Sequence, residues 1–260
     1  MGIEDVLGVA ARFPKECALF SDFDGTLSHI IDDPTLVQPI DGATEVLLEL
    51  TTQLGTVGVV SGRPVSFLER FFQAPIELSG LYGLEHRTGD QVTVDPDAIE
   101  WLPVMSQAAD EARERFGTEA VEDKRYSITI HYRRASEEVG EAVVEWADAV
   151  ARKTGLHAQS AKMSVELHPP TSRTKGDAIA GMLGGMKAAI YLGDDVGDLP
   201  AFERLRAASD SGQLEAYATV LVSSDETAPE MHDAATDVVG TAEEAVDVLK
   251  QFAATSTNFL

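Results

Sequence analysis

Two carboxylates one residue apart are the first side chains of this sequence that could do chemistry. Asp22 and Asp24 follow the apolar run 18–20, and Gly25 directly after them permits a sharp turn. A short apolar run that ends in acidic residues predicts a buried strand whose carboxyl end carries a site. An Asx turn after any strand would show the same residue types, so this stretch decides nothing alone.

Further polar side chains follow two other apolar runs. They are Ser61, then Asp194, Asp195 and Asp198, with Lys175 at the start of the helix before the last run. If the three strands are neighbours, five carboxylates converge on one pocket. Like charges at about 4 Å repel by roughly 4 kcal/mol at an effective dielectric near 20, so the cluster needs protonation or a cation. Oxygen ligands without His or Cys favour Mg²⁺ over zinc. Acidic loop residues scattered in solvent are the alternative, but these would not have to follow an apolar strand each time.

The elements that must position these residues alternate between strands and helices. Apolar residues recur at helical spacing in 41–54, 64–72, 175–183 and 199–207. Buried runs lie at 18–20, 57–60, 188–192 and 217–222. Strand, helix, strand, helix is the pattern of a parallel sheet with crossover helices. We therefore predict an α/β fold with a doubly wound parallel sheet.

The residues between Ser61 and Lys175 include a stretch with a different pattern. In 126–133 and in 162–168, apolar and polar residues alternate. Alternation predicts a sheet that is covered on one face only. We therefore predict a separate α+β domain at 104–173, inserted between two parts of the α/β core at 1–103 and 174–260. Its polar sheet face would be free to contact something else.

Four motifs in this order resemble those of the haloacid dehalogenase superfamily of phosphohydrolases. They are Asp22-Phe23-Asp24-Gly25-Thr26, Ser61, Lys175 and Gly193-Asp194-Asp195-x-x-Asp198. The resemblance covers the whole α/β core. It implies that Asp22 is a nucleophile that forms an aspartyl-phosphate, and that Asp24 protonates the leaving alcohol and then activates water. Ser61 and Lys175 would hold the transferring phosphoryl group.

The same resemblance implies a Mg²⁺ site and contacts to substrate. The implied metal ligands are Asp22, Asp24 through its backbone carbonyl, and Asp194, supported by Asp195 and Asp198. Substrate contacts next to the motifs are implied for Gly25, Thr26, Gly62 and Arg63. Phosphoryl transfer needs an in-line nucleophile, neutralised phosphoryl oxygens and a proton for the leaving group, and these residue types supply all three.

The spacing of the motifs limits the subtype. Only 39 positions (61 − 22) separate Asp22 from Ser61, whereas 114 (175 − 61) separate Ser61 from Lys175. The insert therefore belongs between the second and third motifs, where sugar phosphatases of the superfamily carry an α/β cap. Polar residues of the insert resemble the sugar-contacting cap pattern of trehalose-6-phosphate phosphatases; they are Glu122, Lys124, His131, Arg133, Lys162 and Glu166. Tyr82 stands where that family is expected to have His, and it can still hydrogen-bond.

These expectations define a Mg²⁺-dependent phosphoric monoester hydrolase that converts trehalose 6-phosphate into trehalose and phosphate. Three alternatives stay open: a phosphatase with the same cap that acts on sucrose phosphate or mannosyl-phosphoglycerate, a phosphomutase, and a sensor that binds a sugar phosphate without turnover. A sensor would be expected to lack Asp22 or Asp24, and both are present. The polar cap residues could also be ordinary solvated strand residues.

The composition argues against some classes of partner. A net charge of −24, from 20 basic and 44 acidic side chains, disfavours nucleic acid and anionic membrane surfaces. A local pocket can still be cationic, because surface charge is screened over about 8 Å. No run approaches the ~20 apolar residues of a membrane span. Cys17 is the only cysteine, which predicts no intrachain disulfide and a reducing compartment. We expect a cytoplasmic monomer that acts on a disaccharide phosphate.

Overall fold

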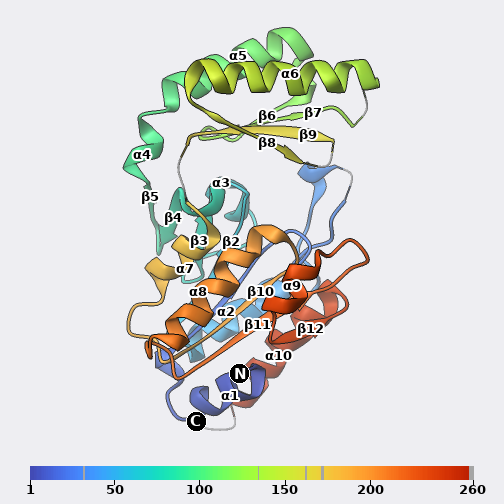
Figure 1. Ribbon diagram of the computed structural model, residues 1–260. Helices are drawn as coiled ribbons and strands as arrows, with labels where there is room; N and C mark the ends of the chain where they lie inside the picture. Colours follow the sequence, from blue (N-terminus) through green and yellow to red (C-terminus); the bar gives the residue numbers. More distant parts are fainter. Residues whose placement is uncertain (32, 134, 162, 171–172, 258–260) are drawn as a thin grey trace. The chain divides into compact units, whose positions relative to one another are not determined.

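The chain forms two compact units. The computed structural model describes residues 1–31, 33–133, 135–161, 163–170 and 173–257. One unit, the core unit, comprises Met1–Thr93 and Arg173–Leu260, and the other, the insert unit, comprises Val94–Ser172. Figure 1 labels the helices and strands of both. The boundary predicted at residue 104 lies inside the insert unit, after helix α4 (Pro96–Ile99).

The core unit contains a sheet that is parallel over most of its width. In the described residues its strand order is β12-β11-β10-β1-β2-β3-β4-β5. The strands are β1 (Cys17–Ser21), β2 (Thr56–Val60), β3 (Glu77–Gly80), β4 (Glu85–Thr88), β5 (Gln91–Val94), β10 (Ala188–Gly193), β11 (Ala216–Val222) and β12 (Asp237–Val239). Pairing is parallel from β12 to β3 and antiparallel between β3 and β4. The chain proceeds from β1 toward β3 on one side and from β10 toward β12 on the other, so a topological switch point lies between β1 and β10.

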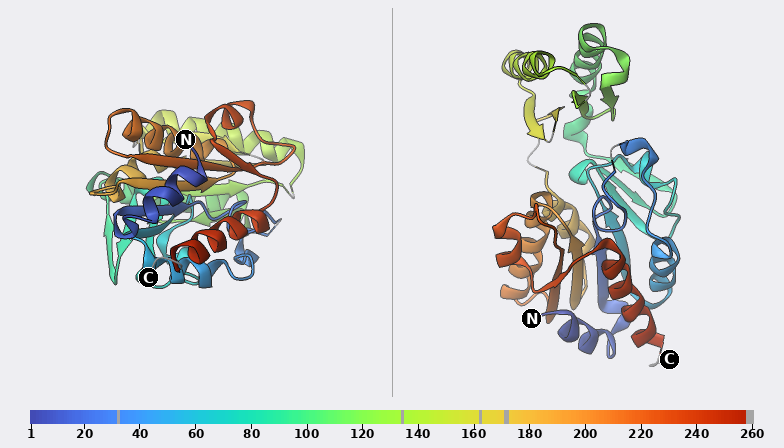
Figure 2. Two further views of the ribbon diagram at one scale, coloured as in Figure 1. Left: turned by 90° about the horizontal axis from the view of Figure 1, so that it is seen from below. Right: turned by 90° about the vertical axis from the view of Figure 1, so that its right-hand side faces the viewer.

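Helices cover both faces of this sheet, as the right-hand view of Figure 2 shows. One face packs against α1 (Ile3–Ala10), α2 (Ala43–Gln53), α3 (Val65–Leu68) and α10 (Ala242–Thr257), and the other against α7 (Lys175–Met182), α8 (Leu199–Asp210) and α9 (Pro229–Ala234). Neighbouring residues of β1 belong to opposite apolar clusters: Leu19 to the first and Phe20 to the second, both with no exposed surface. A strand buried on both faces reads as a continuous apolar run, which is why the doubly wound α/β prediction is confirmed.

The insert unit is an antiparallel sheet with two long helices on one face. The strand order is β6-β7-β9-β8, with β6 (Val121–Asp123), β7 (Ile128–His131), β8 (His157–Ala161) and β9 (Ser164–His168). The apolar positions of β7 and β9 pack under α5 (Leu102–Phe116) and α6 (Glu137–Thr154). The alternation read from the sequence therefore places one face of the sheet in a core, as expected.

One local prediction was wrong. The alternation in 162–168 puts Met163 on the apolar face of a strand, but Met163 has a left-handed backbone (φ 58°) and is 43% exposed, because the strand begins only at Ser164.

Short 3₁₀ segments complete the described structure. They are η1 (Pro14–Glu16), η2 (Pro34–Leu36), η3 (Leu81–Gly83), η4 (Thr118–Ala120) and η5 (Val196–Asp198). Among the helices in the described ranges, none combines the length and the apolar character needed to cross a membrane.

Candidate active site

The ends of β1 and β10 bring two of the acidic motifs together. These strands pair in parallel, and the backbone N–H of Asp22 donates to the carbonyl of Leu192 at 2.8 Å. As a result Asp22 and Asp194 both follow the same edge of the sheet at its switch point, where open α/β sheets bind ligands. One carboxylate oxygen from each of Asp22, Asp194 and Asp198 lies within 4.8 Å of the others. The predicted convergence of these three carboxylates is therefore present.

Lys175 brings a positive charge into this cluster from the first turn of α7. The helix is fixed there by a capping box, in which the Thr174 side chain and the Asp177 side chain each accept from the other's backbone N–H. The Lys175 ammonium lies 2.9 Å from Asp22 Oδ1 and 2.7 Å from Asp198 Oδ1, and the side chain is only 4% exposed. Burial lowers the pKa of Lys175, but Asp198 and Asp22 outweigh it and hold that pKa well above its usual value.

Asp198 is a fully buried carboxylate whose two oxygens both accept hydrogen bonds. Oδ2 accepts from the backbone N–H groups of Asp194 at 3.0 Å and Asp195 at 3.3 Å, while Oδ1 faces Lys175. Gly193 is required here, because a Cβ on it would overlap the Asp198 carboxyl group. These contacts suit Asp198 to organising the loop after β10 rather than to holding a metal directly.

Asp195 lies on the same loop but is exposed to solvent. Its Oδ1 accepts from the backbone N–H of Gly197 at 2.9 Å and caps η5. The Asp195 side chain is therefore a structural cap of the loop, and its support of a metal site stays a prediction.

Burial and mutual repulsion leave the acidic cluster in need of a cation. Burial is the largest cause that raises the pKa of Asp194 to about 8, followed by the charges of Asp198 and Asp195. Burial also raises the pKa of Asp22, opposed by Lys175 and reinforced by the other carboxylates. Within the described cluster the donors are oxygen atoms, the type that hard divalent cations prefer. The residues present therefore fit a metal ion.

Gly25 and Thr26 hold Asp194 in place from the loop after β1. Gly25 has a left-handed backbone (φ 79°), and a Cβ on it would overlap the Asp194 carboxyl group. Thr26 is fully buried, and its hydroxyl donates to Asp194 Oδ1 at 3.4 Å. These two residues were predicted to contact substrate. In the structure they contact the carboxylate of Asp194, one of the predicted metal ligands.

The raised pKa of Asp194 predicts that the metal-free protein loses stability as the pH rises. In the folded protein this carboxyl keeps its proton up to about pH 8, whereas in the unfolded chain it releases it near its ordinary value of 3.8. The folded state therefore holds more protons between these values, so the free energy of unfolding falls as the pH increases. The contribution of this retained proton to stability is complete below about pH 3.8, and it is lost as the pH rises through about 8. Denaturant unfolding in excess chelator, from about pH 5 to about pH 8, measures this.

Two controls separate this effect from general charge repulsion. Added Mg²⁺ should flatten the pH dependence, because the cation takes the place of the proton. Asp194→Asn removes the titrating group and should reduce the slope in chelator. Stability of the metal-free protein that increases over this pH range would contradict the assignment.

Asp24 is held by Arg63 through a two-pronged ion pair. Arg63 Nε donates to Asp24 Oδ2 at 2.9 Å, and Nη2 donates to Oδ1 at 2.8 Å. The guanidinium also stacks over the Phe67 ring at 4.5 Å and donates to the Pro34 carbonyl. Ser61 is buried beside it, and its hydroxyl oxygen accepts the backbone N–H of Arg63. Arg63, predicted to contact substrate, thus fixes the orientation of Asp24 in this structure.

Gly62 and Tyr82 form a close pair next to Ser61. A Cβ on Gly62 would come within 2.8 Å of the Tyr82 ring. Tyr82 has a left-handed backbone (φ 58°) inside η3 and is 38% exposed. Tyr82 therefore lies beside the Ser61 loop, and its contact to substrate stays a prediction.

In the insert unit, four of the predicted sugar-contacting residues pair with one another. Lys124 Nζ lies 3.4 Å from Glu166 Oε1, and His131 Nε2 lies 3.0 Å from Glu122 Oε2. Arg133 follows β7 and is exposed. The prediction for Lys162 falls outside the described residues. The structure therefore gathers donors and acceptors on one sheet face, as a polyhydroxyl ligand requires.

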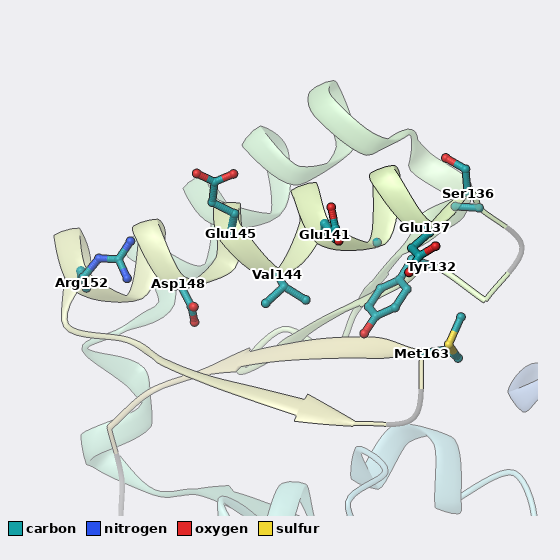
Figure 3. A pocket seen from close by; sticks show the side chains of 11 residues that line it. Tyr132, Ser136, Glu137, Glu141, Val144, Glu145, Asp148, Arg152 and Met163 are labelled. Atoms are coloured by element: carbon teal, nitrogen blue, oxygen red, sulfur yellow. The ribbon is translucent and has the colours of Figure 1, made fainter.

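A separate groove of about 880 Å³ lies along α6 in the insert unit (Figure 3). Tyr132 and Val144 lie on its sheet side, and it is lined by the acidic side chains of Glu137, Glu141, Glu145 and Asp148. Its acidic lining disfavours an anionic phosphate ester. None of the predicted site residues in the described ranges lines this groove.

Comparison with known protein families assigns the chain to one family. The family model described as trehalose-phosphatase matches residues 20–237, which is most of the chain. The chain belongs to the trehalose-phosphatase family.

Curated relatives in the trehalose-phosphatase family agree with this assignment. The chain is 34% identical over 218 residues to the trehalose-phosphate phosphatase of Mycobacterium avium (strain 104), covering 79% of this chain and 54% of the relative. It is 32% identical over 222 residues to that of Mycobacterium leprae (strain TN), covering 79% and 50%. The chain thus spans about half the length of the curated relatives it matches.

Solved structures show the same fold. A trehalose-6-phosphate phosphatase related protein superposes with a TM-score of 0.78 at 23% identity, covering 93% of this chain and 99% of that one. The C-terminal domain of a Candida albicans trehalose-6-phosphate phosphatase gives 0.75 at 19% identity, covering 98% and 97%. A haloacid dehalogenase-like hydrolase from Bacteroides thetaiotaomicron gives 0.62 at 15% identity, covering 90% and 98%. The predicted haloacid dehalogenase-like α/β fold with an inserted α+β unit is therefore confirmed.

Two polar residues next to the candidate site residues were not predicted from the sequence. Ser127 donates to Glu166 Oε1 at 2.6 Å in the insert unit, and Tyr191 donates to Asp198 Oδ1 at 2.6 Å in the core unit. Ser127 directly precedes β7, at a polar position of the alternation in 126–133. Tyr191 lies in an apolar run. The one feature that could have marked it as a site residue is a hydroxyl group two residues before Gly193.

Proposed function

We propose that this chain is a Mg²⁺-dependent phosphatase that hydrolyses trehalose 6-phosphate to trehalose and phosphate. One observation carries the proposal: in a member of the trehalose-phosphatase family, Asp22 lies 2.9 Å from a buried Lys175 and beside Asp194 at adjacent strand ends. This arrangement places a nucleophile (Asp22), a fixed positive charge (Lys175) and a carboxylate that can bind a metal ion (Asp194) close together. Phosphoryl transfer depends on such positioning and charge neutralisation.

In the proposed reaction, an oxygen of Asp22 forms a bond to phosphorus while the bond from phosphorus to the sugar oxygen breaks. Asp24, in its protonated form, transfers its proton to that sugar oxygen. Water then attacks the phosphorus of the aspartyl-phosphate, Asp24 takes a proton from it, and phosphate leaves as Asp22 is regenerated. Mg²⁺, when bound by Asp22, the Asp24 carbonyl and Asp194, supplies further positive charge to the phosphoryl oxygens.

The chain's own residues prepare each of these steps. Lys175 has three N–H donors and faces two carboxylates, so one donor is left for a phosphoryl oxygen. Arg63 donates a hydrogen bond to each carboxylate oxygen of Asp24. One of these two hydrogen bonds has to break before Asp24 can reach a leaving group. The buried hydroxyl of Ser61 lies on the adjacent strand end and would hold the phosphoryl group from that side.

The insert is proposed to act as a cap that binds the sugar part of the substrate and so determines specificity. Its paired residues Lys124 and Glu166, and His131 and Glu122, present both donors and acceptors. Sucrose phosphate and mannosyl-phosphoglycerate carry similar hydroxyl groups, so the same site could accept them. Phosphate release from trehalose 6-phosphate, these two compounds and an aryl phosphate, each with Mg²⁺ and with chelator, tests the proposal. A metal-dependent preference for one of the other sugars would overturn the substrate assignment and leave the phosphatase assignment intact.

Glu166→Ala should damage hydrolysis of trehalose 6-phosphate far more than hydrolysis of an aryl phosphate. Glu166 faces Lys124 and Ser127, and a hydrogen bond to a charged group contributes about 1.5–3 kcal/mol, which corresponds to roughly 10- to 150-fold in kcat/KM. An aryl phosphate has no sugar hydroxyls, so its kcat/KM should change less than about threefold. Steady-state kinetics on both substrates measure the difference.

Glu114→Ala is a matched control, because Glu114 is an exposed residue of α5 in the same unit. It should leave both substrates unaffected. Equal losses on both substrates in the Glu166 variant would mean that Glu166 does not read the sugar.

A further inference from the structure

A buried tyrosine donates a hydrogen bond into the catalytic cluster. Tyr191 lies in β10 with no exposed surface, and its hydroxyl donates to Asp198 Oδ1 at 2.6 Å. The same oxygen accepts from Lys175 Nζ at 2.7 Å. Lys175 in turn lies 2.9 Å from Asp22 Oδ1. A continuous chain of contacts therefore runs from the phenol through Asp198 and Lys175 to the proposed nucleophile.

The contacts of Asp198 show what the phenol adds. Its Oδ2 is fixed by two backbone N–H groups of the following loop, those of Asp194 and Asp195. Its Oδ1 is shared between the phenol and the Lys175 ammonium. Without the phenol, only the flexible Lys175 side chain would hold Oδ1, and lysine donors rotate freely. The phenol is thus the rigid one of the two Oδ1 contacts.

Packing alone does not explain a hydroxyl at this position. The Tyr191 ring packs edge-on against Phe202, with ring centres 5.9 Å apart, inside the apolar cluster under α7 and α8. A phenylalanine would fill the same space, and burying a hydroxyl costs free energy unless it is hydrogen-bonded. The hydrogen bond to Asp198 meets that requirement.

We propose that Tyr191 is a positioning residue for catalysis: its hydroxyl fixes Asp198 so that the Lys175 ammonium stays between Asp198 and Asp22. This inference rests on the proposed phosphatase function. It assigns the hydroxyl a role that acts through two other side chains, without contact to substrate. Partners that orient catalytic groups in this way typically change activity by about 10- to 100-fold when removed.

Tyr191→Phe tests the inference because it removes only the hydroxyl. With Mg²⁺ present, kcat should fall about 10- to 100-fold on both trehalose 6-phosphate and an aryl phosphate, with KM changed less than about twofold. Tyr217→Phe is the matched control, since Tyr217 packs partly buried against the same apolar cluster. The control should keep the wild-type kcat. A Tyr191→Phe kcat within about twofold of wild type would overturn the inference.

A second measurement does not depend on turnover. Nitrogen-15 NMR of the lysine ammonium groups, with the Lys175 signal assigned through its absence in Lys175→Arg, reports the environment of Lys175 directly. The signal should shift or exchange faster in Tyr191→Phe and stay unchanged in Tyr217→Phe. An unchanged signal in Tyr191→Phe would also overturn the inference. If the wild type releases no phosphate from any ester while the Lys175 signal responds to Tyr191→Phe, the proposed function fails and the positioning role stands.

Discussion

Replacing Asp22 by asparagine is expected to reduce phosphate release from trehalose 6-phosphate by about 10⁴-fold or more. The amide has nearly the shape of the carboxyl group but cannot form the aspartyl-phosphate. Asp22 is buried at the end of β1, where its neighbours are Lys175 and other carboxylates. Removal of its charge also relieves like-charge repulsion, so the folded state should persist. Steady-state kinetics with Mg²⁺, together with thermal unfolding of the same sample, measure both consequences.

Asp90→Asn is the matched control, because Asp90 is an exposed residue of the same unit. It should behave as the wild type in both assays. Residual activity of Asp22→Asn within about 100-fold of wild type, in a folded sample that mass spectrometry shows to be free of deamidated protein, would remove Asp22 from the nucleophile role.

Replacing Asp194 by asparagine should produce the second-largest loss, and the loss should concern the metal. Asp194 contacts Gly25 and Thr26. One of its carboxylate oxygens lies within 4.8 Å of an oxygen of Asp22 and of an oxygen of Asp198. Losing one charged ligand weakens a hard-cation site strongly. We expect the Mg²⁺ concentration for half-maximal activity to rise about 10- to 100-fold, with a lower kcat at saturation. Activity titrated against Mg²⁺ measures both.

Asp195→Asn provides the adjacent control on the same loop. Asp195 is exposed and caps Gly197 through one oxygen, a role that asparagine fills equally well. Its Mg²⁺ requirement should therefore stay within about threefold of wild type. If Asp195→Asn raised the Mg²⁺ requirement and Asp194→Asn did not, the two residues would have to exchange roles.

The position of the core site could be predicted from the sequence because parallel strands end at one edge of the sheet. Asp22 and Asp194 each follow a buried run, and pairing of β1 with β10 makes their convergence a consequence of topology. Lys175 was predictable as the start of a helix, which its capping box confirms. The roles of these residues came from the resemblance to a family and remain proposals.

Side-chain pairing within the site could not be predicted in the same way. The ion pair between Asp24 and Arg63 joins residues 39 positions apart (63 − 24), and no periodicity reports a contact of that kind. The hydroxyl of Tyr191 was hidden because an aromatic residue in a buried strand is usually a packing residue. Alternation placed Glu166 on a polar position, but its partner depends on strand register.

One experiment tests the metal requirement and the nucleophile together: phosphate release from trehalose 6-phosphate by wild type and by Asp22→Asn, with Mg²⁺ and with excess chelator. We expect release from the wild type with Mg²⁺ and at most background in the other three reactions. Release by the wild type in chelator at the Mg²⁺ rate would contradict the metal requirement. Release by folded Asp22→Asn at the wild-type rate would contradict the aspartyl-phosphate mechanism, and no release from the wild type with Mg²⁺ would contradict the proposed function.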